Sequence, residues 1–392
     1  MVINVKEIEL EHISSKELNE LREQQKVTYF KSSGRPVVVS NDMLVKVNTN
    51  VGVSEATQKK DVLSLVSEIS ALPYSPDIMM DLTNIELPIP LWEDMLKVFE
   101  GPIGILPHYV LYNTDKGLNK TQLLEKIDEI GEKGVSFITI HPTTNRHIHQ
   151  IASNERLIAS TSRGGSIIYK DMIQNSREVN IFEELYDDIL NLLKKYEMVV
   201  SIGTTYRPSN NIEALDRAHL LEFERQKEFI RRAKENGNQV IMEGIGHLSL
   251  DKLAQYMSKV NELGISLMPL GPMLSDATIG FDHITSAIGA SFASYYGCAN
   301  IINSDTRDEH TGGVPSKESI IEGLKTARVA ARCVDITRIE KIKELEMLIR
   351  RTRQEKKTCV VNGGLFQYTK NQNIESGCDR CKHECPLEIL SV

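Results

Sequence analysis

The chain has 392 residues, enough for one large domain with appendages or for two domains. Hydrophobic residues make up 41% of it and charged residues 26%, which is typical of a soluble globular protein. The formal net charge of -8 provides no electrostatic basis for binding nucleic acid or an anionic membrane surface, so we expect neither as a partner.

The termini and the cysteines favour a cytoplasmic location. The N-terminus is acidic and lacks the apolar core of a signal peptide. No window reaches the roughly eighteen apolar residues that would predict a membrane span. Of the six cysteines, Cys298, Cys333 and Cys359 are scattered and three lie together near the C-terminus, which is not the pattern of a secreted disulfide framework.

Residues 1–42 are mixed and charged without a clear period, and from there short apolar runs alternate with amphipathic stretches. This alternation predicts parallel strands covered by helices. The predicted strands are Leu44–Val47, Ile78–Leu82, Ile103–Leu106, Val135–Ile140, Leu157–Ser160, Met198–Ile202, Val240–Met242 and Ile265–Leu270. The predicted helices between them include Asp61–Leu72, Thr121–Lys133, Ile181–Tyr196, Ala214–Glu235 and Leu250–Leu263.

Eight such units fit either a closed (β/α)8 barrel of the TIM type or a doubly wound sheet. The barrel is favoured, because no Gly-x-Gly-x-x-Gly motif follows the first strand and polar or Gly-rich positions recur just after the strand runs. We therefore predict an α/β fold with an N-terminal segment at 1–42 and the barrel at 43–300. A metal loop and a pair of charged helices follow at 301–354, and a flexible tether with a cysteine-cluster tail at 355–392.

The run Ser162–Ser166, after the fifth predicted strand, is a candidate anion site. It offers backbone N–H groups, hydroxyls and the Arg163 guanidinium, which together suit a phosphate. Arg207 could supply a second positive charge. A plain glycine turn is the alternative interpretation.

Other polar positions at the strand ends have two interpretations each. His141 could donate a hydrogen bond to a substrate or cap the end of its strand. Asn48 and Asn50 could contact a heterocycle or form an ordinary turn. Glu243 is a candidate acid/base, or else a salt-bridged barrel carboxylate.

Two histidines lie in Gly-rich turns. Gly244 and Gly246 permit backbone angles that other residues resist, which would bring His247 into the barrel mouth, and His310 lies in a second such turn. Two histidines on separate elements could bind a borderline divalent metal with coordination positions left open. They could equally be surface or hydrogen-bonded residues.

Three cysteines near the C-terminus, Cys378, Cys381 and Cys385, are spaced Cys-x2-Cys-x3-Cys. Thiols this close together can hold an iron–sulfur cluster, and since such a cluster usually has four Cys ligands, a set of three leaves one iron open to a small molecule. A zinc knuckle with His383 as the fourth ligand, or a chance spacing, are the alternatives.

Together these motifs resemble the phosphomethylpyrimidine synthase family of radical S-adenosylmethionine (SAM) enzymes. The resemblance runs from about residue 43 to 334 and returns at the terminal cysteines. The motifs that carry it, in the family's order, are Leu44–Gly52, Met80–Leu82, Thr139–His141, Ser162–Ser166, Tyr206–Pro208, Met242–His247, Leu270–Pro272, Asp282–Ser286 and Glu309-His310.

The resemblance implies a homodimer of barrels in which Cys378, Cys381 and Cys385 hold a 4Fe-4S cluster. With an external electron donor such as flavodoxin or ferredoxin, the cluster would cleave SAM to a 5′-deoxyadenosyl radical. That radical would rearrange aminoimidazole ribotide to hydroxymethylpyrimidine phosphate for thiamine biosynthesis, a lyase reaction. His247 and His310 would hold a divalent metal, zinc or iron. The implied substrate contacts are Asn50, Met80, Tyr109, His141, Ser162, Arg163, Gly164, Arg207 and Glu243, of which Glu243, His141 and Tyr109 are the catalytic candidates.

The chain also departs from the family's pattern. The family spaces its cysteines Cys-x2-Cys-x4-Cys, and its loop after the sixth strand carries a carboxylate and two glycines that Thr204–Ser209 lacks. Ile245 stands for a Pro and Met268 for a Tyr. Cofactor and phosphate motifs largely survive while residues near the substrate differ. 5-Hydroxybenzimidazole synthase, built on the same scaffold for cobamide synthesis, and a catalytically silent paralogue that binds a ribotide or metal are therefore alternatives.

Overall fold

The computed structural model describes residues 14–357, 359, 381 and 384–389. Its centre is an eight-stranded sheet in which every neighbouring pair is parallel, in the order β10-β3-β4-β5-β6-β7-β8-β9. The strands are β3 (Lys46–Val51), β4 (Ile78–Asp81), β5 (Ile103–Ile105), β6 (Phe137–Ile140), β7 (Val199–Ile202), β8 (Val240–His247), β9 (Ser266–Met273) and β10 (Ile301–Asn303).

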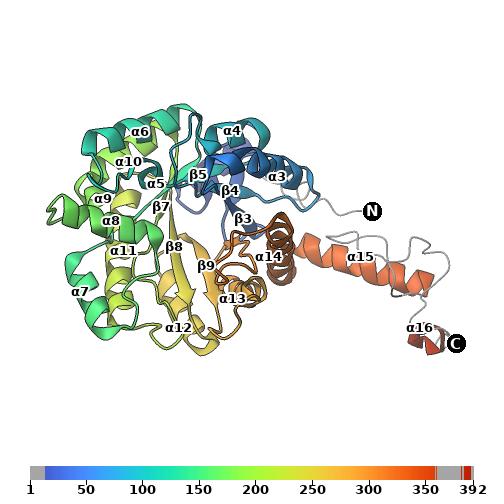
Figure 1. Cartoon of the computed structure of the whole chain (residues 1–392). Coiled ribbons are helices and arrows are strands. Elements are labelled where there is room, and N and C mark those ends of the chain that lie inside the picture. The colour runs from blue at the N-terminus through green and yellow to red at the C-terminus, as the bar shows by residue number, and fades with distance from the viewer. Residues whose placement is uncertain (1–13, 358, 360–380, 382–383, 390–392) are drawn as a thin grey trace.

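The two ends of this sheet meet. The Leu267 N–H of β9 donates to the carbonyl of Cys298, just before β10, at 2.7 Å. The Asn303 side chain of β10 donates to the Pro269 carbonyl of β9, also at 2.7 Å. The sheet is therefore a nearly closed barrel surrounded by helices (Figure 1), and the predicted (β/α)8 TIM-type fold class is confirmed.

Helices pack around the sheet through apolar faces. In α10, for example, Tyr186, Ile189, Leu190 and Leu193 are buried on one side of the helix while its acidic and basic residues face outward. The helices are α2 (Ser15–Glu23), η1 (Ala56–Gln58), α3 (Lys59–Ala71), α4 (Leu91–Val98), α5 (Pro107–Leu111), α6 (Lys120–Glu132), α7 (Arg146–Glu155), α8 (Arg163–Gln174), α9 (Ile181–Glu184), α10 (Tyr186–Tyr196), α11 (Arg217–Glu235), α12 (Leu250–Asn261), α13 (Asp282–Tyr296), α14 (Lys317–Arg338), α15 (Glu340–Lys356) and α16 (Pro386–Ile389).

Inside the barrel, side chains change from apolar to polar along the strands. A barrel floor, toward the strand N-termini, is apolar; above it Thr139, Ser201 and Glu243 are polar. The Phe137 ring fits only because β5 has Gly104 opposite it, where a Cβ would come within 2.1 Å of the ring. The barrel floor consists of Ile78, Phe137, Val199, Ile241 and Ile301.

A short antiparallel hairpin, β1 (Thr28–Phe30) and β2 (Val37–Val39), covers the barrel floor from below. Phe30 meets Phe137 edge to face with ring centroids 5.3 Å apart. The Tyr29 N–H donates to the Gln239 side chain at 2.6 Å, just before β8. The hairpin was not predicted, because residues 1–42 show no clear period. Its burial closes the N-terminal end of the barrel.

One predicted strand was wrong, and one strand of the barrel was not predicted. Leu157–Ser160 is a loop between α7 and α8, in which Leu157 is 94% exposed and Ile158 54% exposed. The eighth barrel strand is instead β10, a stretch with no predicted strand. The predicted helix Ile181–Tyr196 is split into α9 and α10, whereas the predicted charged helical pair is confirmed as α14 and α15.

At its C-terminal end the fold extends beyond the barrel. α15 continues from α14 and points away from the barrel in Figure 1, with Arg332 of α14 bonded to Glu346 of α15 at 3.1 Å. Most of the predicted tether, 360–380, lies outside the described residues. Within the described ranges, no helix combines the length and the apolar character that a membrane span requires. The division of the chain into four segments stays a prediction.

Candidate active site

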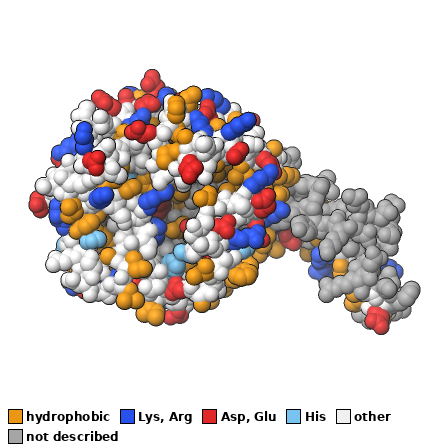
Figure 2. Space-filling view, viewed as in Figure 1, with side chains coloured by type: hydrophobic (Ala, Val, Ile, Leu, Met, Phe, Trp, Pro, Cys, Tyr) orange, Lys and Arg blue, Asp and Glu red, His pale blue; other side chains and the backbone are white. Residues whose placement is uncertain are grey.

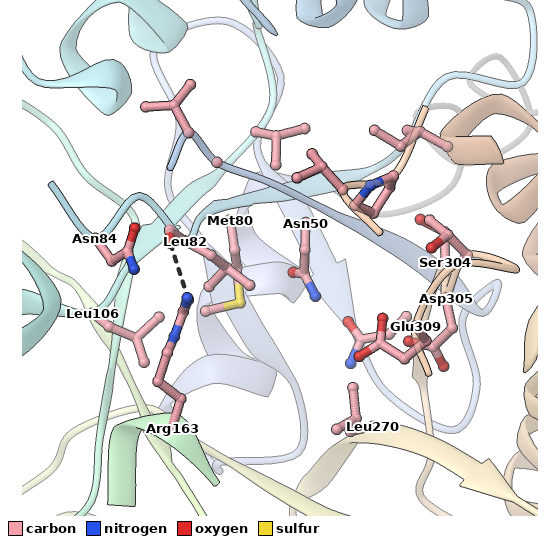
Figure 3. A pocket seen from close by; sticks show the side chains of 18 of the residues that line it. Asn50, Met80, Leu82, Asn84, Leu106, Arg163, Leu270, Ser304, Asp305 and Glu309 are labelled. Carbon is pink, nitrogen blue, oxygen red and sulfur yellow. Dashed lines mark hydrogen bonds between the residues drawn. The ribbon is translucent and has the colours of Figure 1, made fainter. Parts of the chain in front are cut away.

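A cavity of about 870 Å³ lies where the strands end at their C-termini, on a face that Figure 2 shows hollowed near its centre. Side chains from β3, β4, β8, β9 and β10, from the loops after the strands and from α3, α8 and α14 line it; Figure 3 shows part of this lining. Of the predicted substrate contacts, those that line this cavity are Asn50, Met80, Tyr109, His141, Ser162, Arg163, Arg207 and Glu243. The structure thus gathers residues from across the sequence at one mouth.

The Ser-Arg-Gly-Gly run begins a helix. Ser162 is the N-cap of α8, and its hydroxyl accepts from the Gly165 N–H at 3.1 Å. Arg163 lies over the Tyr109 ring, 4.3 Å from its centroid, and donates to the Leu82 carbonyl at 3.1 Å (Figure 3). The helix start therefore faces the cavity with its positive end. The predicted strand before it does not exist, but the candidate anion site is stronger for being a helix N-terminus.

Gly164, the remaining predicted contact, lies behind the cavity wall. A Cβ there would come within 2.4 Å of His141 Cε1 and 3.0 Å of His108 Nε2, so the two imidazoles occupy the space that a side chain would need. His141 Nε2 lies 3.3 Å from the Ser162 hydroxyl. Burial, with the positive charge of Arg207 adding to it, lowers the pKa of His141 to about 3. His141 is therefore neutral, although the helix beside it attracts anions.

His108 was missed by the sequence analysis. It is fully buried, with its ring centroid 5.2 Å from that of His141, and neither ring nitrogen has a hydrogen-bond partner among the described residues. Burial lowers the pKa of His108 well below its usual value, and the positive charge of Arg163 acts in the same direction. His108 follows Pro107 in the short helix α5, and nothing in the surrounding sequence indicates that it would be buried beside His141.

Arg207 lies in the loop between β7 and α11, and a buried carboxylate holds the part of this loop just before it. Both Glu222 oxygens, from α11, accept hydrogen bonds from this loop: the Thr205 and Tyr206 N–H groups and the Thr204 hydroxyl, each at 2.6 Å. Thr204–Ser209 contains no carboxylate of its own, and Glu222 provides one from α11. Burial raises the pKa of Glu222. The Arg207 guanidinium lines the cavity and, within the described part of the chain, makes no hydrogen bond or ion pair of its own.

Glu243 is the carboxylate inside the cavity. Its Oε1 accepts from the Thr139 hydroxyl at 2.6 Å and from the Ser201 hydroxyl at 3.1 Å. No described residue forms a salt bridge with it, so the alternative of an ion-paired barrel carboxylate is not what the structure shows. Burial raises the pKa of Glu243, while its two hydrogen bonds and the charge of Arg207 act in the opposite direction.

His247 and His310 come together beside the cavity. Their ring centroids are 5.1 Å apart. His247 ends β8, where the strand pairing shifts and Ile245 and Gly246 both have positive φ, 77° and 80°. That conformation is easy for glycine and strained for a β-branched residue. The predicted role of the glycine is thus seen at Gly246, and His247 lies on an irregular strand end.

Each histidine of the pair is oriented by a carboxylate. His247 Nδ1 lies 2.7 Å from Asp276 Oδ1, and His310 Nδ1 lies 2.7 Å from Asp282 Oδ1. Metal-binding histidines are commonly held in this way, with the other nitrogen left for the ligand bond. Burial lowers the pKa of His247, which favours the neutral ring. Among the described residues, no group of three or more His, Cys, Asp or Glu side chains is arranged to share one metal ion.

The cysteine cluster is only partly visible. Cys378 lies outside the described residues. Cys381 is exposed and Cys385, just before α16, is buried; both are free thiols. His383, the alternative zinc ligand, also lies outside the described residues.

Comparison with known proteins identifies the family of this chain. The family model described as "Radical SAM ThiC family" matches residues 8–391. A phosphomethylpyrimidine synthase of Thermotoga petrophila is 30% identical over 386 residues, covering 91% of this chain and 87% of that protein. One from Clostridium perfringens is 32% identical over 307 residues, covering 76% of this chain and 70% of that protein.

Among solved structures, a dihydropteroate synthase of Xanthomonas albilineans overlaps 77% of this chain and 98% of its own with a TM-score of 0.44 and 10% identity. The sequence match, by contrast, runs over nearly the whole chain and includes the segment that carries the terminal cysteines. The chain therefore belongs to the radical SAM ThiC family.

Proposed function

We propose that this protein is a radical-SAM lyase that rearranges aminoimidazole ribotide to hydroxymethylpyrimidine phosphate, in thiamine biosynthesis. Its membership of the family supports this, and its curated relatives bear the name phosphomethylpyrimidine synthase. The observation that carries the proposal is one cavity that is lined both by a helix N-terminus with Arg163 and by the half-buried carboxylate of Glu243. A small phosphate ester with a polar ring needs both of these.

The anion side of the cavity would hold the ribotide phosphate. The first turn of α8 presents unpaired backbone N–H groups, and Arg163 is held in place by Tyr109 and by the Leu82 carbonyl. Arg207 has no competing ion pair among the described residues, so its charge is available to the ligand. Ser162, whose hydroxyl already accepts from Gly165, has a proton left to donate to His141 or to the phosphate.

The opposite side would handle protons. With a raised pKa, Glu243 gives and takes a proton closer to neutral pH than an exposed carboxyl does. Neutral His141 would act as a hydrogen-bond partner of the substrate, not as a positive charge. Tyr109, whose ring lies under Arg163, also lines the cavity. Asn50 and Met80 would contact the ring from β3 and β4.

The cofactors follow from the family and fit the residues present. A 4Fe-4S cluster on Cys378, Cys381 and Cys385, with SAM bound to it, would supply a 5′-deoxyadenosyl radical. Of these three cysteines, Cys381 and Cys385 lie in the described part of the chain, and both are free thiols, as cluster ligands must be. The closed barrel floor keeps solvent from the cavity from below, which a reactive intermediate requires.

A divalent metal, zinc or iron, would be held by His247 and His310. Their Nδ1 atoms are engaged by carboxylates, so Nε2 of each ring is the atom left to bind it, and neutral imidazole is the form that does so. Bound there, the metal would help to orient SAM. Ligands beyond this pair would come from SAM or solvent.

A homodimer is the proposed assembly. Apolar side chains follow one exposed face of α13: Ile284 is 44% exposed, Ile288 48% and Tyr295 62%, with Phe281 at 61% just before the helix. A stripe of this kind on the surface is typical of an interface. A flavodoxin or ferredoxin would deliver the electron, and we place the protein in the cytoplasm, where its thiols stay reduced.

Anaerobic reconstitution tests this function. Protein loaded with iron and sulfide receives SAM, a reductant and aminoimidazole ribotide, and products are identified by mass spectrometry. We expect hydroxymethylpyrimidine phosphate and 5′-deoxyadenosine. Cys381→Ala should abolish both, whereas Cys333→Ala, which removes an exposed free thiol on α14, should leave them unchanged.

Other outcomes would contradict the proposal in separate ways. Hydroxybenzimidazole as product would replace the proposed reaction with that of the related enzyme. Deoxyadenosine without either product would show a different substrate. A colourless protein that leaves SAM intact would show that no working cluster forms.

A further inference from the structure

Three asparagines form a hydrogen-bonded row at the edge of the cavity. Asn48 and Asn50 lie on β3, and Asn303 lies on β10 directly opposite Asn48 in the strand register. Asn303 Nδ2 donates to the Pro269 carbonyl at 2.7 Å. Asn48 Nδ2 donates both to Asn303 Oδ1 at 2.7 Å and to Asn50 Oδ1 at 2.8 Å. The row thus runs from a backbone carbonyl to a residue that lines the cavity.

The row fixes which way each amide points. A backbone carbonyl accepts only, so Asn303 must turn its nitrogen to Pro269 and its oxygen to Asn48. Asn48 must then present its nitrogen, which also reaches the oxygen of Asn50. With its oxygen already engaged, Asn50 has its Nδ2 left for the cavity (Figure 3). Asn50 is therefore a hydrogen-bond donor to whatever binds there.

This arrangement leaves one buried oxygen atom without a hydrogen-bond partner, and the barrel fold by itself does not require that. Asn48 is fully buried, and its Oδ1 has no partner among the described residues. Buried polar atoms are nearly always hydrogen-bonded, so an exception needs a reason. Turning the Asn48 amide round would set its oxygen against the oxygens of Asn50 and Asn303, which repel it. The orphaned oxygen is the consequence of holding Asn50 in one orientation.

We propose that Asn48 and Asn303 are positioning residues that make Asn50 a donor, so that the site selects a ring with a hydrogen-bond acceptor at this point. An unprotonated ring nitrogen of an imidazole is such an acceptor. The inference rests on the proposed function, in which Asn50 contacts the ring of a ribotide. It adds a specificity to that contact: a ring of the same shape with a C–H at this point leaves the Asn50 N–H groups without a partner.

A pair of ligands that differ at one atom tests it. 1-(5-Phosphoribosyl)imidazole and 1-(5-phosphoribosyl)pyrrole share the sugar phosphate, but only the imidazole has a ring acceptor. Binding is measured by calorimetry at about pH 8, where an imidazole ring is mostly unprotonated. We expect the wild type to prefer the imidazole by about tenfold or more, the effect of one unmet buried hydrogen bond.

The variants separate positioning from folding. Asn48→Ala should reduce the preference to less than about threefold by letting Asn50 turn, while the pyrrole ligand binds as before. Asn303→Ala should do the same and replaces Asn48→Ala if that variant does not fold. Asn300→Ala is the matched control: Asn300 is also buried, but its amide bonds to Asn41 and Ser266 at the other end of β10. It should keep the full preference.

Three results would overturn the inference. Equal binding of the two ligands by the wild type would show that Asn50 does not select an acceptor. An unchanged preference in both Asn48→Ala and Asn303→Ala would show that the row does not orient it. If the wild type binds neither sugar phosphate, the anion site of the proposed function fails, and the inference with it.

Discussion

His247 and His310 face each other with ring centroids 5.1 Å apart, and the Nδ1 atom of each is 2.7 Å from a carboxylate that comes from a different loop or helix. Asp276 follows β9 and Asp282 begins α13. The pair is thus assembled by four separate points of the chain. Its geometry depends on the two acidic residues as much as on the histidines.

Replacing Asp276 should weaken metal binding. Asp276→Asn removes the negative charge that orients His247 and makes its ring more basic, so we expect zinc affinity to fall by about 10- to 100-fold. The measurement is a zinc titration of protein whose cluster is already reconstituted, so that its cysteines do not compete. Asp251→Asn, at the exposed start of α12, should leave the affinity unchanged. Equal affinities in both variants would rule out the carboxylate's role.

Arg207 should be needed for phosphate binding. Arg207→Gln removes a guanidinium without an ion pair among the described residues, so the ligand loses a charged hydrogen-bond donor. We expect the dissociation constant for ribose 5-phosphate to rise by about 10- to 100-fold and to depend less on salt. Calorimetry at two salt concentrations measures both. Arg217→Gln, which breaks only a surface pair with Glu155, should change neither; a similar loss there would point to a general charge effect.

A methyl group at Gly164 should disturb both imidazoles behind the cavity. The added Cβ of Gly164→Ala would lie 2.4 Å from His141 Cε1, so His141 must move. Overpacking of this kind costs about 1–3 kcal/mol of stability. Urea unfolding measures the loss. Gly313→Ala is the control, since its Cβ would meet only Thr311 at 3.7 Å. A Gly164→Ala protein as stable as the control would contradict the tight packing.

Asp305 should give stability a specific pH dependence. Burial, together with the nearby charge of Glu309, raises the pKa of Asp305 to about 7. The folded state therefore holds a proton that the unfolded chain releases near pH 4, roughly the usual range of the residue. Its contribution to stability is fully present below that pH and is lost as the pH rises toward 7.

The variant Asp305→Asn removes this loss and keeps an oxygen for the Gly271 N–H and the Ser286 hydroxyl. Relative to wild type, its free energy of unfolding should increase between about pH 4 and 7, by up to about 4 kcal/mol. Urea unfolding of the cluster-free protein at several pH values provides the difference curve. Asp188→Asn, exposed on α10, is the control. A flat difference curve for Asp305→Asn would show that the buried carboxyl titrates as it does in the unfolded chain.

The exposed face of α13 should mediate the proposed dimer. Ile288→Glu puts a charge at the middle of the stripe, where a second copy would have to desolvate it. Light scattering after gel filtration should show wild type at twice the chain mass and the variant at the chain mass. Leu157→Glu, which changes a residue 94% exposed on a different loop, should remain dimeric. A wild-type monomer would refute the assembly itself.

The barrel strands could be predicted where burial on both faces produces a local run of apolar residues. Met198–Ile202 is apolar except for Ser201 because β7 is covered on both faces, and β7 lies within this predicted strand. Leu157 and Ile158 are apolar as well, but they are exposed in a loop, and no local pattern distinguishes them from a buried strand. β10 is only three residues long, Ile301–Asn303, too short to show a period, yet it closes the sheet.

The site residues also fall into two groups, those that could be predicted from the sequence and those that could not. Motifs that lie within a few residues, such as Ser162–Ser166 or Glu243–His247, could be recognised from the sequence. Residues that act through tertiary contact could not. Glu222 holds the Arg207 loop from α11, and Asp276 and Asp282 reach their histidines from other elements. Nothing in the sequence around these residues shows what they touch, because the fold alone brings the partners together.

The hairpin beneath the barrel floor determines from which end molecules can reach the cavity. Because Phe30 packs on Phe137, the cavity is closed at the N-terminal end of the barrel. Molecules must enter and leave at the C-terminal end, where α8 begins and the histidine pair lies. A molecule bound against the barrel floor would therefore have to bind before, and leave after, any molecule bound nearer to the opening. If two reactants bind here, as the proposed function requires, an excess of the second would fill the cavity before the first has bound and would slow the reaction.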